Sequence, residues 1–324
     1  MNRPVRLGIL VMGALVLAGL GLCLGSVPLP VQTVWEALTG NAGPRETFLV
    51  VELRLPRVTG ALAAGALLAW SGMLFQGLVR NPLVSPDLLG VEAGATAAVV
   101  LGIVAGWSAA LTGWLAFGGA TTAALVIAIL GARTGGTGHR LILVGLGINA
   151  VLTAAVTFLL VQGNVYQAAK AYQWMVGSLY STTPAEAGYL GASAVVLGAL
   201  GLGFSPALRL LQLGDLGARS LGAPTRAWSV VLGTLASAMA AAAVSVVGPI
   251  GFLALAAPHA ARILAGPVGP WSFLTAGALG ALALLAMDLV GQFGIPGGLP
   301  AGVLAAGLGG PYFLFLLRRR GPVL

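Results

Sequence analysis

The sequence predicts an all-α integral membrane protein: a polytopic bundle of about ten transmembrane helices in a single domain spanning residues 1–324. Hydrophobic residues make up 58% of the chain and charged residues only 7%, whereas soluble proteins carry about 25% charged residues. Apolar stretches of roughly 20 residues, long enough to cross a ~30 Å hydrocarbon core, recur along the chain. A membrane barrel would instead show alternating segments of about 10 residues.

Ten apolar segments are expected to cross the membrane. The first follows a positively charged start, and its length and lack of a clear cleavage site indicate a retained helix. The chain has 50 glycines, which allow membrane helices to approach closely, and its one cysteine, Cys23, cannot form an intrachain disulfide. The segments are 7–25, 58–79, 88–106, 110–131, 141–162, 188–204, 228–248, 250–265 (short for a crossing), 271–291 and 301–317.

Between the second and third segments the chain reads "RNPLVSPDLLG", residues 80–90. Two prolines and an aspartate interrupt an otherwise apolar sequence. Proline breaks a helix by removing a donor and clashing with the preceding turn. Irregular backbone at membrane depth is tolerated only where protein or a water-filled cavity covers it. The stretch therefore predicts a fixed, non-helical turn.

Basic residues predict the orientation of the bundle, because they collect in cytoplasmic loops. With both termini in the cytoplasm, twelve basic residues lie inside and four outside. The net charge of +8 then reflects topology, and no nucleic-acid partner is expected. The outer residues include Arg54 and Arg57 in "RLPR", which depart from the rule and need a reason. The outer set is Arg45, Arg54, Arg57 and Lys170.

The sequence offers little for catalysis. Lys170 is the only lysine and lies between alanines, so the chain has no phosphate-binding loop that ends in Gly-Lys-Ser/Thr. His139 and His259 lie far apart in sequence, without the clustered ligands that a metal site needs. We expect no enzyme activity, no metal and no cofactor in this chain.

One acidic residue falls inside an apolar segment. Asp288, in "ALALLAMDLVGQFG", is costly in a membrane, by about 2.5–3.5 kcal/mol at its centre. It is either a functional carboxylate, as in a stand-alone proton-coupled carrier, or an end-of-helix carboxylate that caps a neighbour or reaches interface water. Glu92 lies early in the third segment, where water or a helix N-terminus could stabilise it.

The cytoplasmic connection 205–227, "SPALRLLQLGDLGARSLGAPTRAW", predicts two short helical stretches separated and closed by glycine. Helices this short are marginal alone in water. We therefore expect the connection to pack against something, although an ordinary surface loop remains the alternative.

Several long stretches carry a resemblance to the FecCD-type permeases, the membrane subunits of bacterial ABC importers for iron-siderophores, haem and cobalamin. The similarity runs along nearly the whole chain. Its most specific parts are 54–95, beginning "RLPRVTGALAAGALL", and 248–262, "GPIGFLALAAPHAAR". It also covers "LILVGLGIN", "YQWMVGSL", "LGDLGARSLGAPTRAW" and "LPAGVLAAGLGGPYFLFLLRR".

The resemblance implies a pore in the bacterial inner membrane, formed with a second permease copy or a paralogue. Two cytoplasmic ATP-binding subunits, which bind ATP-Mg, lie below it and an extracytoplasmic substrate-binding protein docks above. Arg54 and Arg57 match arginines that meet carboxylates of the binding protein. Connection 205–227 matches the segment that contacts the ATPases, with Gln212, Leu213, Gly214, Asp215, Ala218, Arg219 and Leu221 as contact residues. Asn81, Pro82 and Leu83, with Gly138 and His139 in "GTGHR", match a cytoplasmic gate.

One stretch departs from the family pattern. Many relatives have Arg-x-x-x-x-Pro-x-Glu-Leu-Pro-x-Gly near the last outer loop, where this chain reads "QFGIPGGLPAG". Gln292 and Gly298 occupy the charged positions, so a third docking arginine is missing. The resemblance implies a ferric siderophore, haem or cobalamin as cargo, and family frequency favours the siderophore.

Overall fold

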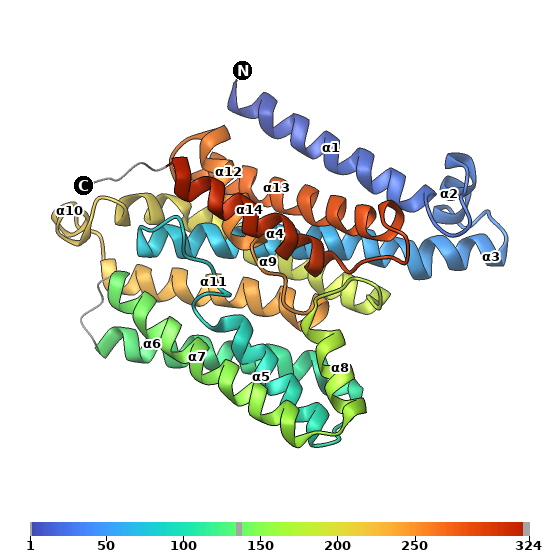
Figure 1. Ribbon diagram of the computed structural model, residues 1–324. Coiled ribbons are helices and arrows are strands. Elements are labelled where there is room, and N and C mark those ends of the chain that lie inside the picture. The colour runs from blue at the N-terminus through green and yellow to red at the C-terminus, as the bar shows by residue number, and fades with distance from the viewer. Residues whose placement is uncertain (1, 134–137, 320–324) are drawn as a thin grey trace.

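The computed structural model describes residues 2–133 and 138–319, with side chains described for 2–130 and 141–312. Within those ranges all regular secondary structure is helical, with no strand. Figure 1 shows most of the long helices lying roughly side by side. The elements are α1 (Arg3–Cys23), α2 (Val31–Leu38), α3 (Pro44–Thr47), the π-helix η1 (Phe48–Arg54), α4 (Leu55–Val79), α5 (Val91–Val104), the 3₁₀ turn η2 (Ala109–Leu111), α6 (Thr112–Arg133), α7 (Gly138–Gln162), α8 (Val165–Met175), α9 (Pro184–Leu211), α10 (Asp215–Ser220), α11 (Thr225–Val247), α12 (Leu253–Ala265), α13 (Pro270–Leu289), the π-helix η3 (Val290–Gly294) and α14 (Ala301–Arg319).

Each of the ten predicted apolar segments falls on one helix. Seven helical stretches in the described ranges are long and apolar enough to cross a membrane. Helices α5 and α12 are apolar but shorter, with 14 and 13 residues. The all-helical, multi-pass character is therefore confirmed, while a total of ten crossings stays a prediction.

Helix α4 is the centre of the bundle and packs against α9, α11, α12 and α13. Glycine makes these contacts close. A Cβ atom on Gly65 would collide with the backbone of Gly280 in α13, and one on Gly72 with the carbonyl of Ala254 in α12. Small residues at such crossings allow the backbone approach that holds membrane helices together.

Polar side chains in this core are hydrogen-bonded to neighbouring helices. Trp70 of α4 stacks on Phe273 of α13, with ring centroids 5.4 Å apart, and donates its indole N–H to the Phe273 carbonyl at 2.9 Å. Ser71 donates to the Ala236 carbonyl at 2.7 Å. Gln76, which is fully buried, donates to the Leu255 carbonyl at 3.1 Å and contacts the Arg262 guanidinium. These bonds fix α4 against α11, α12 and α13.

The connections contain more helix than the sequence suggested. Helix α9 continues through Pro206 to Leu211, so "PALRLL" is the end of a 28-residue helix and not a separate short one. The long connections 26–56 and 163–187 contain α2, α3, η1 and α8. A capping box at Asn164 and Gln167 begins α8.

The two ends of the bundle are built differently. Figure 1 shows α2 and α3 at the right-hand end and α10 at the left-hand end. The orientation predicted from the basic residues makes the α10 end cytoplasmic. The end that carries α2 and α3 is therefore the outer end, and the end that carries α10 is the inner end.

Candidate functional site

A buried ion pair joins α4 to α13 at the outer end. The Arg57 guanidinium donates through Nε to Asp288 Oδ2 at 2.7 Å and through an Nη nitrogen to Asp288 Oδ1 at 2.9 Å. The Asp288 side chain is 3% exposed and that of Arg57 is 17% exposed. Such a two-point contact is the strongest geometry for arginine and carboxylate. It explains how an apolar segment tolerates Asp288.

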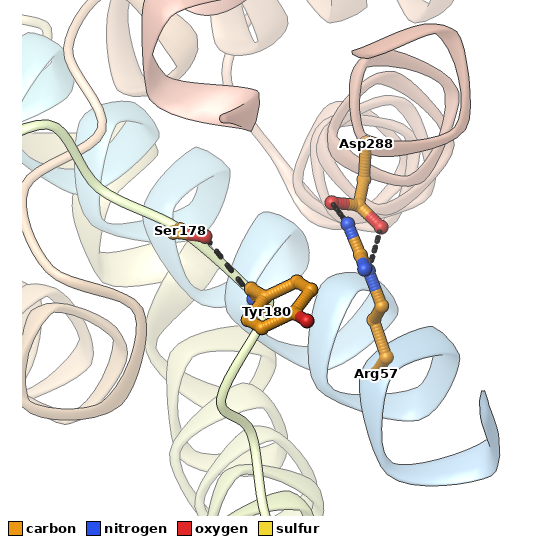
Figure 2. Close-up of polar contacts among 4 residues, drawn as sticks. All are labelled: Arg57, Ser178, Tyr180 and Asp288. Atoms are coloured by element: carbon orange, nitrogen blue, oxygen red, sulfur yellow. Dashed lines mark hydrogen bonds and ion pairs between the residues drawn. The ribbon is translucent and has the colours of Figure 1, made fainter. Parts of the chain in front are cut away.

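An aromatic ring lies beside this pair. Figure 2 shows Tyr180 beside the Arg57 guanidinium, on the chain that connects α8 to α9. The ring centroid lies 5.8 Å from the guanidinium carbon, within the range of a cation–π contact. The Tyr180 backbone N–H donates to the Ser178 hydroxyl at 3.1 Å, which closes a short turn. Tyr180 itself is 83% exposed, so the cluster reaches the outer surface.

Arg54 has a different environment, although it lies only three residues away. Its guanidinium donates to the carbonyls of Leu22, Cys23 and Val27 at 2.8, 3.1 and 2.6 Å. The last four carbonyls of a helix have no partner within the helix. Arg54 therefore satisfies the C-terminus of α1 and fixes it against η1.

These contacts change the interpretation of Asp288. A proton-relay carboxylate has to be free to exchange its proton, and Asp288 instead accepts two hydrogen bonds from a cation. The structure thus favours the end-of-helix role, although the partner is an arginine and not interface water. The carrier hypothesis loses the residue on which it depended.

The stretch that departs from the family pattern continues directly from this pair. Gln292 lies in η3, one turn beyond Asp288, and its side chain is exposed. Gly298 has a φ of 71°, a backbone conformation in which a glutamate would be strained. At these two positions the outer surface therefore lacks the charges that many relatives carry.

The predicted non-helical turn is present between α4 and α5. Arg80 ends α4 in the left-handed conformation, with φ 56°. Asn81 Oδ1 then accepts the Leu83 backbone N–H at 3.0 Å, and Leu89 packs into the core. The Asn149 amide of α7 donates to the Asp87 carbonyl at 3.2 Å, so the turn is attached to a second helix. Asn81, Pro82 and Leu83 are partly exposed at its start.

The inner end carries an exposed apolar tip, formed by residues 212–221. Leu213, Leu216 and Leu221 are 60%, 86% and 64% exposed. Asp215 and Arg219 form an exposed ion pair at 2.8 Å along α10, and Ala218 is the one buried residue in the helix. Exposed leucines clustered outside the apolar segments indicate a protein partner. Sequence reasoning missed Leu216, although it lies in the same short connection as Leu213 and Leu221.

The tip is attached to the end of α4. Gln212 donates its amide to the Gly77 carbonyl at 3.1 Å, in the last turn of that helix. The Arg80 guanidinium lies beside Gly214. A displacement of the tip would therefore act directly on the point where α4 ends and the 80–90 turn begins.

A groove of about 760 Å³ lies beside the tip. It is lined by Arg219, Pro224, Thr225 and Arg226 together with the apolar side of α11. Its lining is mostly apolar, and Arg219 at its edge is paired with Asp215. The second part of the predicted gate, Gly138 and His139, lies at the start of α7. Residues 134–137 and the His139 side chain lie outside the described part of the structure.

Comparison with known proteins gives matches along the whole chain. The model of the FecCD transport family matches residues 12–319. The ferric enterobactin transport system permease protein FepG of Escherichia coli (strain K12) is 38% identical over 95% of this chain and 94% of its own length. The hemin transport system permease protein HmuU of Yersinia pestis is 36% identical over 98% of this chain and 96% of its own length. A solved metal-chelate type ABC transporter in an inward-facing conformation has a TM-score of 0.87 at 25% identity, and the match covers 98% of this chain and 100% of that one.

Proposed function

The chain belongs to the FecCD transport family, and on that premise we propose that it is the permease subunit of a binding-protein-dependent ABC importer in a bacterial inner membrane. It forms the pore with a second copy or a paralogue. Two cytoplasmic subunits bind and hydrolyse ATP-Mg, and this chain carries out no chemistry itself.

The observation that carries this proposal is the link between the exposed tip and the 80–90 turn. A partner that holds Leu213, Leu216 and Leu221 moves Gln212, which is bonded to the end of α4. The motion reaches Asn81, Pro82 and Leu83, the proposed gate, within one helical turn. Energy from a separate ATPase can thus open the inner end without a catalytic residue in this chain.

The outer end is the proposed docking surface for the substrate-binding protein. Arg57 uses two of its five N–H donors on Asp288, and three remain for a carboxylate of the docked protein. The ion pair holds the guanidinium in place, so docking costs little side-chain entropy. Arg54 lies one turn earlier, with its guanidinium at the end of α1.

The proposed cargo is a metal chelate, and a ferric siderophore is the first choice. The names of two relatives support this class, since one carries ferric enterobactin and the other hemin. Haem and cobalamin are the other compounds to test. Selection among them is assigned mainly to the binding protein.

Gln212→Ala tests the proposed coupling. The variant keeps the exposed leucines but loses the bond to Gly77. We expect it to co-purify with its ATPase subunits as the wild type does, while cargo no longer stimulates their ATP hydrolysis. Full stimulation in this variant would contradict the proposed route, and failure of the wild type to bind any ATPase would contradict the function.

Docking is tested with the pair Arg57→Gln and Asp288→Asn in one chain, which removes the guanidinium without leaving an unpaired buried charge. Capture of the binding protein should weaken by roughly tenfold or more. Arg45→Gln, at an exposed arginine of α3, is the control. Unchanged capture in the double variant would remove Arg57 from the docking surface.

A further inference from the structure

Two carboxylates converge on a cavity between α5, α7 and the 80–90 turn, and neither the predicted gate nor the outer ion pair uses them. The cavity has a volume of about 220 Å³. Asp87 of the turn and Glu92 of α5 line it from one side, and Asn149 and Thr153 of α7 from the other.

The carboxylates have oxygens without partners. Glu92 is 6% exposed, and its Oε1 is buried with no hydrogen-bond partner. The same holds for Asp87 Oδ1. A buried charge of this kind is costly unless it is paired or bound to a metal. Both side chains line the same cavity, so a ligand in it would lie close to both carboxyl groups.

The surroundings do not supply a counter-charge. Among the described residues that line the cavity there is no arginine, lysine or histidine. The N-terminus of α5 offers Glu92 a partial positive charge, equivalent to about half an elementary charge. That offsets part of the charge of one carboxylate and supplies no full counter-charge to the pair. A divalent cation would neutralise both carboxylates.

The remaining donors are oxygens of the kind that hard cations prefer. The Thr96 hydroxyl donates to the Glu92 carbonyl at 2.9 Å, and the Thr153 hydroxyl lies 3.3 Å from Asn149 Oδ1. Lone pairs on these hydroxyl oxygens stay available for a cation. No group of three or more His, Cys, Asp or Glu suited to a metal occurs in the described chain, which argues against a zinc-type site.

We propose that this cavity binds one partly hydrated Mg²⁺ ion, held by Asp87 and Glu92. Mg²⁺ is typically bound through one or two carboxylates and keeps several of its waters. At about 30 Å³ for each water, the cavity has room for the ion and its remaining waters. The ion would join the turn that carries Asp87 to α5 and α7, beside the proposed gate.

Mn²⁺ is a suitable probe, because it is paramagnetic and takes the same oxygen ligands as Mg²⁺. The purified full-length chain, without nucleotide or ATPase, is titrated with Mn²⁺ and the free ion is measured by electron paramagnetic resonance. We expect one bound ion for each chain, displaced by excess Mg²⁺. Neither cargo nor transport enters this assay, so its outcome is independent of the proposed function.

Glu92→Gln and Asp87→Asn should each weaken Mn²⁺ binding at least tenfold, and Thr153→Val, at an exposed position, should weaken it several-fold. Glu52→Gln, an exposed carboxylate of η1, should leave binding unchanged. The Thr153 variant keeps the test decisive if the buried variants fold poorly.

Three results would overturn the proposal. The first is a wild-type chain that binds no Mn²⁺ at millimolar concentration. The second is binding that survives in Glu92→Gln and Asp87→Asn. The third is an infrared band of a protonated carboxyl group, seen at neutral pH in a chain that binds no Mn²⁺ and absent from Glu92→Gln. Such a band would show that the two carboxyl groups share a proton instead of a metal.

Discussion

Replacing Asp288 by asparagine tests the buried ion pair at the outer end. The substitution keeps the shape of the side chain and removes its charge. The Arg57 guanidinium, whose side chain is 17% exposed, then has no counter-ion. An isolated charge in this position is poorly solvated, so the folded bundle should lose stability.

The contact geometry sets the expected size of the loss. Two charge-assisted hydrogen bonds of 2.7 and 2.9 Å disappear or weaken, each contributing about 1.5–3 kcal/mol. Removing one partner of a buried pair costs about 3–5 kcal/mol in soluble proteins. The partial exposure of Arg57 lets water recover some of that, so we expect about 3 kcal/mol. Removing both charges, with Arg57→Met and Asp288→Leu, should cost far less.

The assay is a double-mutant cycle on the purified chain, unfolded reversibly by a denaturing detergent in mixed micelles. Arg57→Gln, Asp288→Asn and the combined variant are compared with the wild type, and Arg45→Gln is the control at an exposed arginine. We expect a coupling free energy of about 2–3 kcal/mol. If the two single losses add up to the double loss within about 0.5 kcal/mol, the residues do not interact and the reasoning is refuted.

Four further predictions follow from named contacts. Gly72→Ala should destabilise the bundle by about 1–3 kcal/mol, because its methyl group meets the Ala254 carbonyl. Gly118→Ala, with open space around it, should be neutral or stabilising. Equal effects of the two substitutions in the detergent titration would contradict the packing of α4 on α12. Arg54→Gln should speed maleimide labelling of Cys23 several-fold, since the end of α1 loses two hydrogen bonds and the chain just after it loses one. An unchanged rate relative to Arg45→Gln would show that Arg54 does not fix that end. Leu216→Ser should abolish co-purification with the ATPase subunits without lowering stability, because the side chain is 86% exposed. Tyr166→Ser, at an equally exposed position on α8, should still co-purify with the ATPase subunits. Co-purification of both variants would remove Leu216 from the contact. Asp288→Asn should leave ATP-dependent uptake per folded transporter largely intact, and its abolition would restore a transport role for the carboxylate.

Much of the fold could be predicted because lipid imposes a simple rule on sequence. A helix that faces hydrocarbon must be apolar along its whole length, so all ten predicted segments coincide with helices. The turn at residues 80–90 was equally accessible, since Pro82 and Pro86 cannot sit in a regular helix interior without cost. Helix α8 was missed, although Asn164 and Gln167 form a capping box that the sequence displays.

The candidate site was less predictable, because its contacts join distant parts of the chain. Arg57 and Asp288 are separated by 231 residues, and no local pattern connects them. Each was singled out alone, one as a docking residue and one as a possible proton relay. The bond from Gln212 to Gly77 spans 135 residues and was missed for the same reason.

The central claim is that a separate ATPase drives transport through this chain. The most direct test is uptake of a radiolabelled ferric siderophore by proteoliposomes containing the chain, its ATPase subunits and its binding protein. We expect uptake only when ATP is supplied on the side of α10, and none when the ATPase subunits are omitted. Uptake by the chain alone, driven by a proton gradient without ATP, would contradict the account.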